Sequence, residues 1–246
     1  MKSVKSRAAP RLYIGTGLRP GAEIALSEAA RAHAAALRLR AGDAVRLFDG
    51  SGGEYAAILT QAGRDLHASV GEFADSACES PLHVTLAQCL ASGDRMDITL
   101  QKVTELGVSA IQPLQSARSI VRLDEARMAR RHTHWQNVVI SACEQCGRNS
   151  VPAVAPILDL VDWLASSPAE GMRLMLSPDA TIGLRDLQPA APITLLVGPE
   201  GGLSPEEQQM ARAAGFTGLR LGPRVLRTET APLAALAALQ AMWGDM

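Results

Sequence analysis

The chain has 246 residues, of which 47% are hydrophobic and 20% are charged, and its formal net charge is −1. This composition excludes a disordered, collagen-like or disulfide-dense chain. No apolar run approaches the roughly 18 residues of a membrane span, and no apolar segment follows the basic N-terminus as in a secretory signal. We therefore expect a globular, cytoplasmic protein without a membrane segment, built as one large domain or two smaller ones.

The basic residues are unevenly distributed. Lys and Arg outnumber Asp and Glu over residues 1–150, whereas the acidic residues are in excess over residues 151–246. A polyanionic partner is therefore to be sought on the first 150 residues.

Residues 11–73 predict a small β-rich unit. Short strands are expected over residues 11–15, 22–26, 44–50, 54–60 and 65–73, separated by turn signals. One helix interrupts them, from Ser27 as N-cap to Leu39, with Gly42 just beyond its end. The small, polar segment 74–81 that follows, ADSACESP, suits a linker.

From residue 82 onward, strands and helices alternate. Strands are expected over residues 82–90, 109–114, 172–177, 193–198 and 216–222, and helices over residues 94–106, 124–146, 159–166, 205–214 and 230–243. Such alternation predicts an α/β unit with a mostly parallel sheet covered by helices. Ligands bind at the carboxyl ends of strands in such sheets, so we expect the site in the loops that follow residues 177, 198 and 222.

The first of two unusual loops is Gly198-Pro199-Glu200-Gly201-Gly202-Leu203, which precedes a helix with Ser204 as N-cap and Pro205 at its first position. Its glycines allow the backbone to approach a ligand closely. The loop has neither the Walker sequence nor the GxGxxG spacing of dinucleotide folds, which disfavours phosphate binding. A plain strand-to-helix turn is the alternative interpretation.

The second unusual loop, residues 221–232, reads LGPRVLRTETAP. Helix capping by Thr228 or Thr230, with Glu229 near the helix N-terminus, explains the threonines. It does not explain the two arginines, Arg224 and Arg227.

A third candidate is the end of the long helix, SACEQCGRN at residues 141–149. Its cysteines have CxxC spacing, but Cys78, Cys89, His132 and His134 are poorly spaced to complete a zinc site. We therefore expect reduced, buried cysteines and no metal. The polar residues at this helix end could instead bind the edge of a nucleic-acid base; they are Glu144, Gln145, Arg148 and Asn149.

Four segments, in order, carry a resemblance to a known family. They are TELGVSAIQPLQSARS at 104–119, ACEQCGR at 142–148, LLVGPEGGLS at 195–204 and LGPRVLRTETA at 221–231. Together they closely resemble the RsmE family, the 16S ribosomal RNA uridine-N3 methyltransferases of the SPOUT superfamily. The resemblance implies a PUA-like β-barrel that binds RNA over residues 1–73 and a trefoil-knotted α/β methyltransferase domain over residues 82–246, in a homodimer.

The resemblance also implies that S-adenosylmethionine binds between three loops. The cofactor-binding residues expected from it are Leu176, Ser177, Pro178, Val197, Gly198, Pro199, Glu200, Gly201, Leu221, Gly222, Leu226, Arg227, Thr228, Thr230 and Ala231. For the chemistry, Arg227 suits stabilisation of charge on the target base. Either Glu229, or Glu144 from a second subunit, could remove the imide proton, and the sequence does not rank the two.

The RNA partner, 16S rRNA or the small ribosomal subunit, is expected to contact several polar residues. They are Arg11, Arg38, Arg40, Arg118, Gln145, Arg148 and Asn149. Arg38 and Arg40 are equally compatible with a solvated helix end, in which case the RNA path follows the basic middle segment with Arg118, Arg122, Arg130 and Arg131. The last helix is apolar on more than one face, which indicates a dimer interface or burial within one subunit.

Two other functions fit parts of the sequence. A non-catalytic RNA-binding protein with a degenerate knotted domain is disfavoured by the intact loops at 198–203 and 221–231. A small-molecule α/β enzyme would leave the N-terminal unit without a task.

Overall fold

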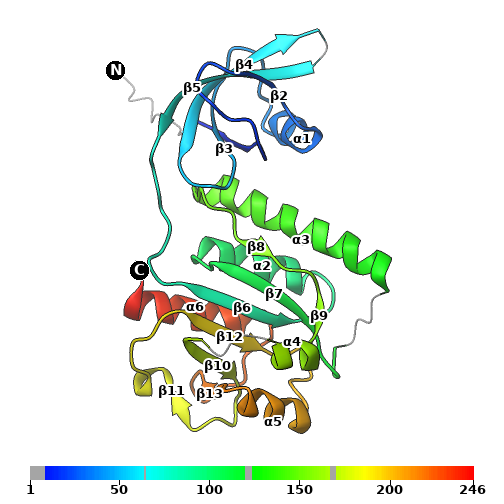
Figure 1. Cartoon of the computed structure of the whole chain (residues 1–246), viewed down its shortest axis with the longest axis vertical. Coiled ribbons are helices and arrows are strands. Elements are labelled where there is room, and N and C mark those ends of the chain that lie inside the picture. Colours follow the sequence, from blue (N-terminus) through cyan, green and yellow to red (C-terminus); the bar gives the residue numbers. More distant parts are fainter. Residues whose placement is uncertain (1–8, 64, 120–123, 167–169) are drawn as a thin grey trace. The chain divides into compact units, whose positions relative to one another are not determined.

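The computed structural model describes residues 9–63, 65–119, 124–166 and 170–246, and the chain separates into two compact units (Figure 1). The first unit consists of residues 1–79 and 143–151, and the second of residues 80–142 and 152–246. Residues 143–151, which the sequence analysis grouped with the methyltransferase domain, therefore pack with the N-terminal residues.

The first unit is a mixed sheet with one helix. Its elements are β1 (Arg11–Tyr13), β2 (Glu23–Ala25), α1 (Glu28–Ala36), β3 (Ala44–Phe48), β4 (Glu54–Ala62) and β5 (Asp65–Ala74). The strand order is β1-β3-β4-β5-β2, with β1 and β3 parallel and the other pairs antiparallel. Alternate residues of the strands, such as Leu12, Leu47 and Leu59, are buried with Ala30 and Ala34 of α1, as period-two and helical patterns require.

Helix α1 ends earlier than the sequence predicted. Ser27 caps its start through a hydrogen bond from the Ala30 amide, as expected. Its last residue is Ala36, because Arg38 takes a left-handed conformation with φ of 60° and ends the helix in the way glycine usually does. The helix therefore stops well before Gly42.

The second unit is a parallel sheet covered on both faces. Its elements are β6 (Val84–Cys89), α2 (Arg95–Glu105), β7 (Ala110–Gln115), α3 (Glu125–Cys146, whose last turn belongs to the first unit), β8 (Ala153–Val154), β9 (Leu158–Asp159), α4 (Leu160–Ser166), β10 (Met172–Leu176), β11 (Ile182–Gly183), a 3-10 turn (Leu184–Asp186), β12 (Ile193–Val197), α5 (Pro205–Ala213), β13 (Thr217–Arg220) and α6 (Thr230–Trp243). The α/β architecture with a parallel sheet is thus confirmed. Short strands β8, β9 and β11 were not predicted, because two residues carry no detectable periodicity.

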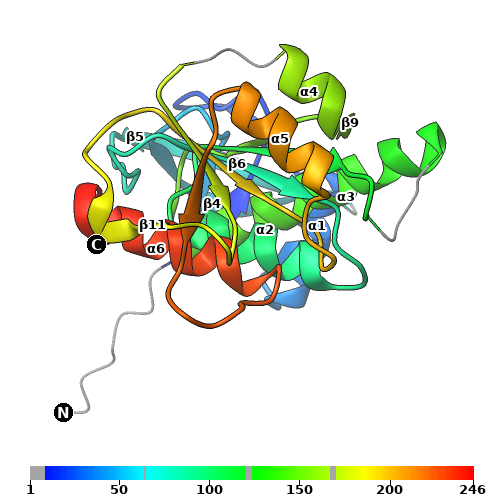
Figure 2. The ribbon, with the colours of Figure 1, turned by 90° about the horizontal axis from the view of Figure 1, so that it is seen from below.

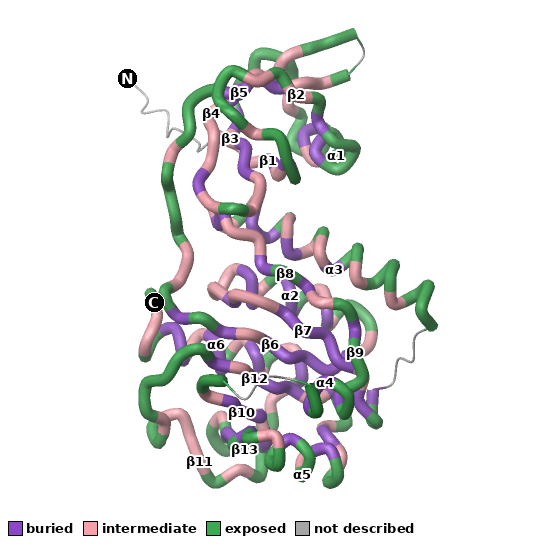
Figure 3. Tube along the Cα trace, in the orientation of Figure 1, coloured by how far each residue is buried: buried purple, intermediate pink, exposed green. Residues whose placement is uncertain are grey.

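The strand order in this sheet is β11-β13-β10-β12-β6-β7-β8, with β9 also pairing with β7, and every pair is parallel. Helices α4 and α5 lie on one side of the sheet and α2 and α6 on the other (Figure 2). The central strands β6, β7 and β12 are almost entirely buried (Figure 3). Strand β12 inserts between β10 and β6, so the loops after β10, β12 and β13 reach the same edge of the sheet.

Among the described residues, no helix is both long and apolar enough to cross a membrane.

Candidate active site

A cavity of about 640 Å³ lies in the second unit at the carboxyl ends of β10, β12 and β13. Its walls are the loop segments 175–179, 197–203 and most of 221–231, joined by Arg95, Arg118, Gln208 and Leu219. This is the size range of pockets that hold a cofactor-sized molecule. The three loops singled out in the sequence therefore form one pocket.

All but one of the residues expected to bind cofactor line this cavity; the exception is Thr230. Thr230 is the first residue of α6, and its amide donates a hydrogen bond of 2.9 Å to the Arg227 carbonyl. Thr230 is therefore part of the helix start and does not line the cavity.

Two glycines leave open space along the walls. Gly202 and Gly222 have φ values of +66° and +76°, and a Cβ built on either would meet no atom within 4 Å. Gly198 is different, because its Cβ would lie 3.0 Å from the Leu203 amide nitrogen and crowd the tight turn. The loop thus needs glycine both for backbone conformation and for close approach.

Thr228 links two of the loops. Its buried hydroxyl donates a hydrogen bond of 2.8 Å to the Gly198 carbonyl and lies 3.3 Å from Nε2 of Gln88, from which it accepts. The sequence suggested helix capping for Thr228, but the N-cap position is Glu229 and no side chain caps the helix. That prediction was wrong because the hydroxyl donates its hydrogen bond to a carbonyl of another loop.

Charged side chains surround the pocket. Arg118, Arg224 and Arg227 are exposed, and Arg118 donates a hydrogen bond of 3.0 Å to the Gly201 carbonyl. Glu229 is largely buried, with 19% of its side chain exposed, and its Oε2 has no hydrogen-bond partner among the described residues. Because Glu229 is among the residues that line the cavity, its side chain can contact a bound molecule.

Sequence reasoning missed Ser92 and Arg95, which follow β6. Arg95 forms ion pairs with Glu200 at 3.0 Å and with Glu229 at 3.5 Å. Because β12 lies beside β6 in the sheet, the loop after β6 meets the loop after β12. That adjacency has no local signal in the sequence.

Glu144 lies in the first unit rather than at this cavity. Its Oε1 accepts a hydrogen bond of 2.9 Å from the Tyr13 amide, and its Oε2 lies 2.6 Å from Nδ1 of His33. Both oxygens are therefore engaged, and only 8% of the side chain is exposed. This arrangement favours Glu229 over Glu144 as a proton acceptor.

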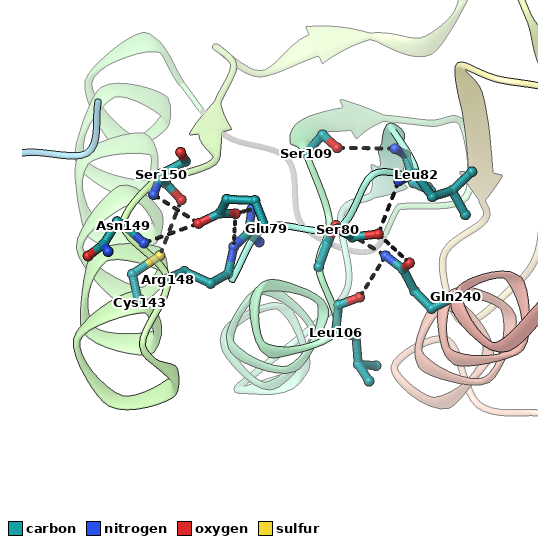
Figure 4. A network of polar contacts seen from close by, with 12 residues as sticks. Glu79, Ser80, Leu82, Leu106, Ser109, Cys143, Arg148, Asn149, Ser150 and Gln240 are labelled. Atoms are coloured by element: carbon teal, nitrogen blue, oxygen red, sulfur yellow. Dashed lines mark hydrogen bonds and ion pairs between the residues drawn. The ribbon is translucent and has the colours of Figure 1, made fainter. Parts of the chain in front are cut away.

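Arg148 and Asn149 are buried in the same unit. Arg148 pairs with Glu79 at 2.7 Å, and the Asn149 amide donates to the other oxygen of that carboxylate at 3.1 Å (Figure 4). Arg11 binds Glu54 and donates to Oδ1 of Asn149 at 2.7 Å. These contacts join residues 143–151 to the N-terminal strands. The side chains of Arg11, Arg148 and Asn149 are largely buried in these contacts, which gives no support to the prediction that they contact RNA.

The other residues expected to bind RNA are exposed: Arg38, Arg40 and Gln145 in the first unit, and Arg118, Arg130 and Arg131 in the second. Arg122 lies outside the described residues. Exposure leaves these side chains able to reach a phosphate or a base.

The cysteines are free thiols, of which Cys89 and Cys143 are fully buried. Burial raises the pKa of each of these two thiols to about 12. They are therefore poor nucleophiles and poor metal ligands near neutral pH. In the described part of the chain, no group of three or more His, Cys, Asp or Glu side chains could hold a metal ion.

Two family models match the chain. An RNA methyltransferase domain matches residues 78–240, and an RNA methyltransferase PUA domain matches residues 18–66. Ribosomal RNA small subunit methyltransferase E of Buchnera aphidicola is 30% identical over 246 residues, covering 99% of this chain and 97% of that protein. The chain belongs to the ribosomal RNA small subunit methyltransferase E family.

Solved structures agree with this family. Ribosomal RNA small subunit methyltransferase E from Neisseria gonorrhoeae, bound to S-adenosylmethionine, is 46% identical with a TM-score of 0.92, covering 96% of this chain and 99% of that chain. A Legionella pneumophila protein, also in complex with S-adenosylmethionine, is 37% identical with a TM-score of 0.92 and covers 98% of this chain and 100% of that chain.

Proposed function

We propose that this chain methylates N3 of a uridine in 16S ribosomal RNA, with S-adenosylmethionine as methyl donor. Family membership and the donor-bound relative at 46% identity support the donor and the RNA substrate. The observation that carries the proposal is the single cavity formed by the loops after β10, β12 and β13.

The cavity fits this cofactor. Leu176, Val197 and Leu226 provide an apolar wall for an adenine ring, while backbone N–H and C=O groups of the glycine-containing loops can bind its edge and the ribose. The open space at Gly202 and Gly222 lets backbone approach the ligand without a side chain in between.

The acceptor requires a proton to be removed, because an imide nitrogen is protonated at neutral pH. When bound, S-adenosylmethionine supplies a methyl group on a sulfonium with a neutral leaving group, so alignment provides much of the acceleration. Glu229 takes the N3 proton, and the exposed guanidinium of Arg227 stabilises the negative charge that develops on the uracil ring. The C–S bond of the donor breaks as the C–N3 bond forms.

Exposed arginines provide the path for RNA. Arg118 and Arg224 lie at the cavity, where phosphates on either side of the target nucleotide can bind them. Arg38 and Arg40 extend the contact to the first unit, whose family model is a PUA domain of RNA methyltransferases.

The protein is proposed to act as a homodimer with a trefoil knot in the second unit. Helix α6 buries one face within its own unit, through residues that include Leu236 and Leu239. Its remaining surface is also apolar, with Ala234, Ala241 and Met242 exposed. This second apolar face supports a subunit interface, and the insertion of β12 between β10 and β6 supports a knotted crossing of the chain.

Deletion of the gene tests the function in the cell. Nucleoside mass spectrometry of 16S rRNA from the deletion strain should show the loss of one 3-methyluridine, and the wild-type gene should restore it. Unchanged 3-methyluridine in the deletion strain would overturn the proposal.

A further inference from the structure

Arg95, the first residue of α2, lies between two of the loops that form the cavity. Its Nη1 is 3.0 Å from Oε1 of Glu200, in the loop after β12, and its Nε is 3.5 Å from Oε2 of Glu229, in the loop after β13. These two carboxylates are far apart in the sequence. Arg95 therefore connects α2 to the loop after β12 and to the loop after β13.

Glu200 is held by more than Arg95. Its Oε1 accepts hydrogen bonds from the Ser92 amide at 2.8 Å and from the Ser92 hydroxyl at 2.6 Å. Burial acts to raise the pKa of this carboxyl, but the Ser92 hydrogen bonds and the Arg95 charge outweigh it and lower the pKa. Glu200 is thus an ionised anchor for its loop, and it keeps two donors if Arg95 is removed.

The Glu229 carboxylate relies on Arg95 more than the Glu200 carboxylate does. Its Oε2 is buried and has no hydrogen-bond partner among the described residues. Within the described chain, the Arg95 guanidinium is the one cation that pairs with it. A carboxylate in such a position is costly unless a cation compensates it, so the orientation of Glu229 is set by Arg95.

We infer that Arg95 is a positioning residue that orients the Glu229 carboxylate toward the nucleobase and fixes the loop after β13 against the loop after β12. This inference rests on the proposed role of Glu229 as the proton acceptor. A guanidinium suits the task because it presents several donors in a fixed plane and can serve two carboxylates at once, whereas lysine offers a single point charge.

The test combines Arg95→Gln and Arg95→Lys with a double-mutant cycle against Glu229→Gln, using small ribosomal subunits from the deletion strain as substrate. We expect Arg95→Gln to lower kcat roughly 30- to 100-fold, since a misplaced catalytic group costs about that much. Its Kd for S-adenosylmethionine, measured by calorimetry, should change less than about threefold, because Ser92 still holds Glu200 and the hydrogen bond from Thr228 to Gly198 still joins the two loops. Arg95→Lys should recover part of kcat.

Two further variants separate this effect from a general disturbance of the fold. Lys102→Gln removes another cation from α2, where Lys102 pairs only with Glu105 among the described residues, and should leave kcat and Kd unchanged. Ser92→Ala should raise the Kd for S-adenosylmethionine, because it removes the hydroxyl that donates to Glu200 and that accepts a hydrogen bond of 2.7 Å from Nη1 of Arg95, while both carboxylates remain as ion-pair partners of Arg95. The thermal unfolding midpoint of each variant reports on folding.

The decisive result is the coupling between Arg95 and Glu229. In a Glu229→Gln background, Arg95→Gln should have almost no further effect on kcat. If it lowers kcat by the same factor in both backgrounds, Arg95 does not act through Glu229 and the inference fails. If Glu229→Gln alone leaves kcat unchanged, the failure lies instead in the proposed role of Glu229.

Discussion

The Thr228 hydroxyl donates a hydrogen bond of 2.8 Å to the carbonyl of Gly198, and this bond ties the loop after β13 to the loop after β12. Both loops form walls of the cavity. Because Thr228 is buried, its hydroxyl has no water to replace a lost partner.

Thr228→Val should therefore weaken cofactor binding. The methyl group retains the shape of the side chain but leaves the Gly198 carbonyl without its donor, at a cost of about 1 to 1.5 kcal/mol. This corresponds to a rise of roughly tenfold in the Kd for S-adenosylmethionine, measured by calorimetry. Thr228→Ser keeps the hydroxyl and should bind the cofactor nearly as tightly as the wild type. Equal Kd values for wild type and Thr228→Val would show that the hydrogen bond from Thr228 to Gly198 does not support cofactor binding.

Gly202→Ala tests the open backbone of the loop after β12. The left-handed conformation of Gly202 should cost the variant about 1 kcal/mol of stability, and the added methyl should also obstruct the ligand. Gly42→Ala is a matched control, since Gly42 also has a positive φ, with open space around its Cβ, but lies in the first unit. Thermal unfolding should show a similar loss for both variants, whereas calorimetry should show weaker S-adenosylmethionine binding for Gly202→Ala alone.

Arg38 and Arg40 test the RNA path over the first unit. The variant Arg38→Asn with Arg40→Gln removes both charges, and asparagine tolerates the left-handed conformation at position 38. RNA binding should weaken, and the slope of log Kd against log salt should fall by about 0.7 to 0.9 for each lost phosphate contact. The Kd for S-adenosylmethionine should not change.

Arg31→Gln is the control for that experiment, because Arg31 is an exposed arginine of α1 that pairs with Asp65. Unchanged RNA affinity and salt slope in the Arg38 and Arg40 double variant would assign the RNA path to Arg118, Arg130 and Arg131 instead.

A charge placed on the second apolar face of α6 would test the proposed homodimer. Light scattering should give twice the mass of the chain at micromolar concentration, and Ala234→Arg should shift it toward the monomer, because a charge buried at an interface is costly. Met210→Arg, on the exposed surface of α5, is the control and should remain dimeric. A monomeric wild type would contradict the proposed assembly.

Arg227→Ala should separate catalysis from binding. Loss of a group that stabilises charge in the transition state typically lowers kcat about 100-fold or more. RNA affinity should stay within about twofold, because Arg118 and Arg224 remain at the cavity. A similar loss in RNA affinity and in kcat would instead make Arg227 a phosphate-binding residue.

The sequence predicted the parts of this site that are local. The glycine loop after β12, the N-cap of α5 at Ser204 and the start of α6 at Thr230 all follow from neighbouring residues. The role of Thr228 could not be predicted, because its acceptor comes from another loop, and Arg95 was missed because its partners depend on the order of strands in the sheet. Arg148 and Glu144 look like surface residues at a helix end, and only tertiary pairing with Glu79 and His33 buries them.

The position of the transferred methyl group tests the proposed activity. Purified protein should be incubated with isotopically labelled S-adenosylmethionine and small ribosomal subunits from the deletion strain, and the 16S rRNA then digested and sequenced by mass spectrometry. We expect one labelled 3-methyluridine with wild-type protein and little or none with Glu229→Gln. A label on another atom or another nucleotide class, or no label with a protein that binds S-adenosylmethionine, would contradict the proposed activity.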